Sequence, residues 1–151
     1  MADNLREEFR RRAEEALAGH PDLRPEWTAD LSRLWFPHVD DLGFDVEVCV
    51  GDREIVVQAL GAHEHFALGN GIPSDVCASV LGLVRDLLSP DMRIREIRSR
   101  GRPFRWFVES RNGPEWQVEA ETGLLFFNYF GGRSERVYQN RQLPGRMHRA
   151  G

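Results

Sequence analysis

Two histidines, His63 and His65, lie two residues apart in a segment that alternates like a β-strand. Side chains at this spacing project from the same face of a strand, so the two imidazoles would point together. With Glu47 from a neighbouring strand they would form a set of two histidines and one carboxylate, which suits zinc or iron. The alternative is a pair of surface or hydrogen-bonded histidines. We favour that alternative because no helical H-E-x-x-H motif accompanies the pair.

A second candidate region is a cluster of arginines between residues 93 and 105, interleaved with aromatic residues. Such a pattern can bind single-stranded nucleic acid through charge and stacking. The same part of the chain also contains glutamates that could pair with the arginines across neighbouring strands. We therefore expect a salt-bridged sheet surface and no nucleic-acid partner. The six arginines are Arg93, Arg95, Arg98, Arg100, Arg102 and Arg105.

The third candidate is the stretch LLFFNYFGG at residues 124–132, which would be apolar on both faces of a strand. An antiparallel sheet normally turns a polar second face to water, and a large exposed apolar patch indicates a binding surface. The alternative is that the C-terminal tail or a tryptophan-bearing helix covers this face. If it is a binding surface, we expect a protein partner or self-association. The predicted contact residues are Arg105, Phe107, Phe126, Asn128, Phe130 and Arg133.

Composition and charge limit the class of protein. The chain has 151 residues, enough for one globular domain, and all 20 of its basic residues are arginine. An all-arginine composition rich in Ala, Gly and Leu is typical of a bacterium with GC-rich DNA. Residues 1–90 carry 8 Arg against 17 Asp and Glu, whereas residues 91–151 carry 12 Arg against 7 acids. The asymmetry predicts either a dipolar molecule with distinct partners or an acidic part packed beside a basic one.

Several features bear on the compartment. The charged N-terminus has no apolar run of signal-peptide length, and no segment is long and apolar enough to span a membrane. Cys49 and Cys77 form no C-x-x-C motif, so we expect two free thiols in a reducing compartment. These features predict a cytoplasmic protein with no membrane association.

The hydrophobic periodicity predicts the elements that position these candidates. Helical spacing appears from Asn4 to Ala18, from Pro25 to Phe36 and from Pro73 to Leu88, whereas period-two alternation or flanking turns indicate strands elsewhere. The predicted order is α-α-βββ-α-ββββ, an α+β class with an antiparallel sheet of six or seven strands and helices on one face. We expect a single domain over residues 1–151, with a flexible tail over 141–151. The predicted strands cover residues 44–50, 54–60, 63–68, 92–99, 103–110, 115–121 and 124–130.

No catalytic or cofactor-binding motif is present in the sequence, and we expect no cofactor. The favoured hypothesis is a non-enzymatic binding module, comparable in size and architecture to adaptors, immunity proteins or chaperones. One alternative is a domain or enzyme that binds a metal or small ligand in a pocket around His63 and His65. The other is nucleic-acid binding by the arginine-rich hairpin 93–105.

Overall fold

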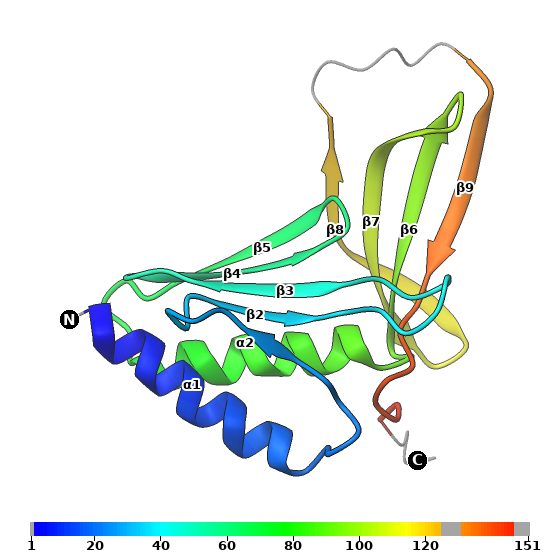
Figure 1. Ribbon diagram of the computed structural model, residues 1–151. Coiled ribbons are helices and arrows are strands. Elements are labelled where there is room, and N and C mark those ends of the chain that lie inside the picture. The colour runs from blue at the N-terminus through cyan, green and yellow to red at the C-terminus, as the bar shows by residue number, and fades with distance from the viewer. Residues whose placement is uncertain (1, 125–130, 147–151) are drawn as a thin grey trace.

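The computed structural model describes residues 2–124 and 131–146 and shows two helices and two antiparallel sheets (Figure 1). The first sheet has the strand order β1-β2-β3-β4-β5, and both helices cover one of its faces. We call these seven elements the body. Their bounds are α1 Ala2–Ala18, β1 Glu26–Trp27, β2 Arg33–Phe36, β3 Val46–Val50, β4 Glu54–Ala59, β5 Ala62–Ala67 and α2 Pro73–Leu88.

The core of the body lies between the apolar face of the sheet and the apolar faces of the two helices. Every second residue of a strand contributes to the first, and residues three or four apart contribute to the others. On β3, Val46, Val48 and Val50 are buried, whereas the residues between them are partly exposed. Phe9 of α1 is fully buried, and its ring meets Trp27 edge to face at 5.9 Å between centroids. The sequence therefore places one apolar face of each element in a common interior, as expected for a sheet covered on one side.

The second sheet stands away from the body as a separate projection, which we call the arm (Figure 1). Its strands are β6 Met92–Ser99, β7 Arg102–Asn112, β8 Glu115–Gly123 and β9 Arg133–Tyr138, in the order β8-β7-β6-β9. The turn between β6 and β7 consists of Arg100 and Gly101, both with positive φ. This conformation matches the two-residue turns that join twisted antiparallel strands.

The body and the arm meet where the β4–β5 turn packs against β7. A Cβ atom at Gly61 would overlap the indole of Trp106, so only glycine allows the turn to approach this closely. On the same side of the arm, Ile94, Trp106 and Tyr138 belong to the hydrophobic core. We call this side the inner face of the arm and the opposite side its outer face.

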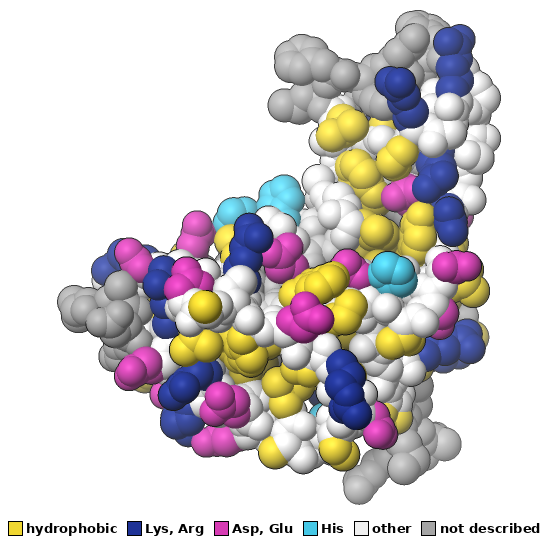
Figure 2. Space-filling view, viewed as in Figure 1, with side chains coloured by type: hydrophobic (Ala, Val, Ile, Leu, Met, Phe, Trp, Pro, Cys, Tyr) yellow, Lys and Arg dark blue, Asp and Glu magenta, His cyan; other side chains and the backbone are white. Residues whose placement is uncertain are grey.

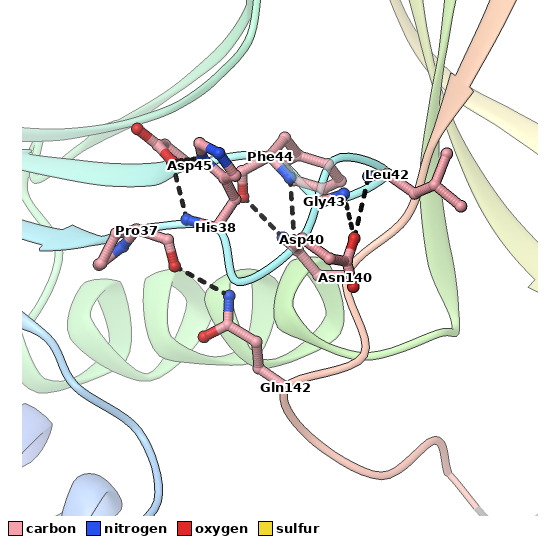
Figure 3. A network of polar contacts seen from close by, with 9 residues as sticks. All are labelled: Pro37, His38, Asp40, Leu42, Gly43, Phe44, Asp45, Asn140 and Gln142. Carbon is pink, nitrogen blue, oxygen red and sulfur yellow. Dashed lines mark hydrogen bonds and ion pairs between the residues drawn. The ribbon is translucent and has the colours of Figure 1, made fainter.

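The C-terminal segment 139–146 fixes the base of the arm to the body through buried polar contacts (Figure 3). The Asn140 side chain is 1% exposed; its amide nitrogen donates to the carbonyls of Phe44 and Leu87, and its oxygen accepts from the Phe44 amide. Leu143 is buried, and its amide donates to the Leu88 carbonyl. Residues 141–146 of the expected flexible tail are thus held against the body, and residues 147–151 lie outside the described residues.

The α+β class and the antiparallel pairing predicted from the sequence are confirmed, and two parts of the prediction need correction. The helix expected at 25–36 is the β1–β2 hairpin, and the single expected sheet is two sheets. Leu34 and Phe36 alternate into the core, while the Asp30 carboxylate accepts hydrogen bonds from Thr28 and Ser32 in the turn between the strands. Nine strands are described instead of six or seven, and the predicted strand 124–130 lies almost wholly outside the described residues. Among the helices that the structure describes, none is long and apolar enough to cross a membrane.

Candidate functional site

The base of the outer face carries a ladder of arginine, glutamate and aromatic side chains. Glu109 of β7 is only 4% exposed, and its two oxygens accept hydrogen bonds from Nε of Arg93 at 2.6 Å and Nε of Arg95 at 2.8 Å. The Arg93 guanidinium lies 4.3 Å from the ring centre of Trp116, and that of Arg95 lies 4.3 Å from the ring centre of Phe107. The hydrogen bond to Glu109 raises the pKa of Arg95. These charges therefore satisfy one another, and the ladder fixes its side chains in place.

Apolar side chains flank the ladder on the outer face. Val118, opposite Glu109, is 52% exposed, and Val137, opposite Arg95, is 37% exposed. The half-buried Ile97 and Phe107 lie on the two strands between them. Figure 2 shows the opposite, body-facing side of the arm, where apolar side chains lie beside arginine and acidic ones. Aromatic residues and arginine are enriched in protein interfaces, so the outer face has a suitable composition for binding another protein.

Several arginines at the distal end of the arm have no acidic partner in the part of the chain that the structure describes. Arg102 and Arg133 both lie opposite Ser99, one on each neighbouring strand. Among the described residues, no carboxylate lies within ion-pair distance of Arg100, Arg102 or Arg133. The guanidiniums of Arg105 and Arg133 lie 5.9 and 5.8 Å from the ring centre of Phe104. The distal end can therefore offer unpaired positive charge to a partner.

The structure brings three of the six predicted contact residues together. Arg105 and Phe107 lie two residues apart on β7, and Arg105 shares the Phe104 ring with Arg133 of β9. The other three, Phe126, Asn128 and Phe130, lie outside the described residues. The role of all six in binding stays a prediction.

Strict period-two alternation along β8 would place Trp116 and Val118 on the same face as Ala120, but the structure does not. The pairing instead shifts register between Val108 and Glu109, so Ala120 lies opposite Val108 and Val118 lies opposite Glu109. Such a bulge inserts an extra residue into one strand. It moves Trp116 and Val118 to the outer face, and no feature of the sequence announces it.

The expected pairing with glutamate across neighbouring strands is confirmed for three of the six arginines. Besides the Glu109 pairs of Arg93 and Arg95, Arg105 contacts Glu121 at 3.3 Å. Arg98 instead contacts Glu96 of its own strand at 2.6 Å. Glu96 is 4% exposed and also accepts a hydrogen bond from Nε1 of Trp106 at 2.9 Å. Much of the positive charge that favoured nucleic acid is thus neutralised within the sheet.

The predicted metal ligands share a surface of the body but are not gathered into one site. His63 and His65 lie side by side on β5, with ring centres 5.3 Å apart. Glu47 is on β3, with β4 between, so the separation across the sheet is roughly 10 Å. Glu47 contacts Arg33 at 3.2 Å, and His65 contacts Glu54 at 3.2 Å. In the described part of the chain, no group of three or more His, Cys, Asp or Glu is placed to hold a metal ion.

A cleft of about 950 Å³ lies between α2, β5 and the arm. Apolar side chains of all three regions line it, including Phe66, Leu83 and Val108, and His63 lies at its border. The Arg146–Asp86 ion pair, at 2.9 Å, also lines the cleft. Neither His65 nor Glu47 contributes to the lining, so the pocket expected around both histidines contains only one of them.

No known protein family, curated protein or solved structure matches this chain.

Proposed function

We propose that this chain is a non-enzymatic module that binds another protein through the outer face of the arm. One observation carries the proposal: Val118 and Val137 expose apolar surface on a face against which no described helix or strand packs. Apolar surface presented by a projecting sheet is costly to leave in water and is typical of an interaction site.

The partner would carry an apolar patch bordered by carboxylates. Phe107 and Val118 would anchor the apolar part, because buried aromatic and aliphatic groups supply most of the binding free energy at protein interfaces. Arg102 and Arg133 have no acidic partner among the described residues, so they are free to form charge-assisted hydrogen bonds with carboxylates of the partner. The Arg93–Glu109–Arg95 ladder would hold the face rigid before binding, which lowers the entropic cost of association.

Composition supports a bacterial cytoplasmic setting for this activity. All 20 basic residues are arginine, as expected from GC-rich coding DNA. Cys49 and Cys77 are free thiols, and burial raises the pKa of Cys77 to about 11, so that this thiol stays protonated and unreactive near neutral pH.

A quantitative capture experiment tests the proposal. The wild-type chain, Val118→Arg and Val39→Arg are immobilised and exposed to native lysate, and bound proteins are quantified by mass spectrometry. Val39 is a matched control because it is 72% exposed and lies in the loop between β2 and β3, outside the arm. We expect a partner that wild type and Val39→Arg retain and that Val118→Arg loses by about tenfold or more, the loss expected at an interface anchor. Equal retention by all three proteins would contradict the proposal.

A further inference from the structure

At one edge of the arm, β9 pairs with no described strand other than β6. β9 is the last strand in the order β8-β7-β6-β9, and residues 133–137 are all exposed. The Arg100 amide donates to the Gly132 carbonyl at 3.0 Å. Hydrogen-bonded pairs alternate along an antiparallel ladder, so Ser134 and Arg136 also bond toward β6. The N–H and C=O groups of Arg133, Glu135 and Val137 therefore point to the free side.

The opposite edge, β8, is protected against pairing with another strand. Its ladder with β7 contains the bulge at Val108 and Glu109, which locally twists the strand. It also carries Glu115, Glu119 and Glu121, so two copies of β8 would bring like charges together. β9 has neither protection: its pairing with β6 is continuous, and it contains charges of both signs. Exposed edges of this kind pair with other strands.

We propose that β9 pairs antiparallel with β9 of a second copy of this chain, centred on Ser134, so that two arms form one continuous sheet. In this register Arg133 of each copy lies opposite Glu135 of the other, which gives two reciprocal ion pairs across the interface. Both residues have backbone groups that point to the free side, as a hydrogen-bonded pair requires. This pairing uses the backbone edge of β9 and does not depend on the proposed function, which uses the outer face; Arg133 belongs to both surfaces.

The charges of β9 select this register over its neighbours. Two-fold symmetry places the central residue of one copy opposite the same residue of the other copy. Centring the pair on Arg133 or Arg136 would bring two arginines together, and centring it on Glu135 would bring two glutamates together. Like charges directly opposite destabilise a strand pair, whereas opposite charges stabilise it. Ser134 is thus the centre that the sequence RSERV favours. Glu135 already lies 3.5 Å from Arg95 within its own chain, so it would bridge two arginines in the dimer.

The direction of β9 also keeps the two bodies apart. β9 runs from the distal end of the arm toward the body (Figure 1). An antiparallel partner centred near the distal end would therefore run outward, with its body at the far end of the joined sheet. The two bodies lie at opposite ends and do not compete for the same space.

A charge-exchange experiment tests the pairing and its register together. Dimer dissociation constants are measured by sedimentation equilibrium for wild type, Arg133→Glu, Glu135→Arg and the double variant. Each single change replaces two attractive pairs by two repulsive ones, so we expect about a tenfold or larger increase in the dissociation constant. The double variant restores opposite charges and should return to within about threefold of wild type. Wild-type protein that stays monomeric at tens of micromolar, or a double variant as weak as the singles, would overturn the proposal.

Symmetric crosslinking provides an independent measurement. Ser134 of one copy would lie opposite Ser134 of the other in a non-hydrogen-bonded pair, with the two Cα atoms about 4.5 Å apart. A disulfide can span this distance. In a Cys49→Ser background, Ser134→Cys should form a disulfide-linked dimer under mild oxidation, whereas Gln117→Cys on β8 should not. If Gln117→Cys crosslinks as fast as Ser134→Cys, β9 is not the dimer edge.

Discussion

The body and the arm are antiparallel sheets of similar size that are stabilised in different ways. In the body, two helices cover one face of the sheet, and fully buried residues such as Phe9 and Val48 form an apolar interior. In the arm, neither of the described helices covers the outer face, and Glu109 is buried there by two arginines and two aromatic rings. The inner face also buries Glu96 beneath Trp106 and Arg98. A sheet without a helical layer can thus bury its side chains through ion pairs and cation–π contacts.

The body and the arm differ in the substitutions that they tolerate. Apolar contacts in the body tolerate substitution by residues of similar volume, because the hydrophobic effect has no direction. The ladder of the arm depends on the fork geometry of arginine, which lysine cannot reproduce. The absence of lysine from the chain is therefore structurally useful in the arm, whatever its origin in DNA composition.

The largest expected effect is in the body. Phe9→Ala removes a fully buried ring that packs against Trp27, and should lower the free energy of unfolding by about 3–5 kcal/mol. Urea denaturation followed by far-UV circular dichroism measures this loss. Leu42→Ala is the control, because Leu42 is 64% exposed and its change should stay within about 0.5 kcal/mol. A loss below 1 kcal/mol for Phe9→Ala would mean that the body does not depend on its apolar core.

A smaller effect is expected in the arm. Glu109→Gln keeps the shape of the side chain but removes the charge that holds Arg93 and Arg95, and should destabilise the arm by about 2–3 kcal/mol. Amide hydrogen exchange of β6 and β7 reports this locally. Glu121→Gln is the matched control on the same sheet, because its pair with Arg105 is exposed and should contribute below about 1 kcal/mol. Equal exchange in the two variants would show that the buried ladder is no stronger than a surface pair.

The smallest effect concerns pH and the β1–β2 turn of the body. Hydrogen bonds from the Ser32 hydroxyl, the Ser32 amide and the Thr28 hydroxyl lower the pKa of Asp30 from 3.8 to about 2. Because the folded pKa lies below the unfolded value, this stabilisation is present above pH 4 and is lost as pH falls toward 2. Asp30→Asn should remove that dependence, so the difference in urea midpoint between wild type and variant should shrink from pH 5 to pH 2. A difference that stays constant over this range would contradict the assignment.

Local signals in the sequence were sufficient to predict the bounds of several helices and strands. Pro73 at the start and Ser89-Pro90 at the end delimit α2, and the predicted bounds 73–88 agree with the structure. The strand 92–99 and the Arg100-Gly101 turn were also predicted correctly. The β1–β2 hairpin was mistaken for a helix because Trp27, Leu31, Leu34 and Trp35 occur at helical spacing. Packing of Leu34 and Phe36 against the core outweighed that local preference.

The candidate site was predictable only in part. The pairing of the arm's arginines with glutamates follows from charge pattern and strand spacing, and Arg105 and Phe107 were correctly placed on one face. The metal hypothesis considered which face each side chain occupies but not how many strands lie between Glu47 and the histidines. Strand order is a property of the whole sheet, so local alternation cannot supply that distance.

The sequence by itself determined the α+β class, the antiparallel pairing and the charge balance of the arm, because periodicity and turn residues act between near neighbours. Only the tertiary structure decided that β9 lies beside β6, that a bulge turns Trp116 and Val118 outward, and that Gly61 lets the body approach Trp106. Each of these depends on contacts between residues distant in the chain. Their free energies are set by packing and register, which no local pattern encodes.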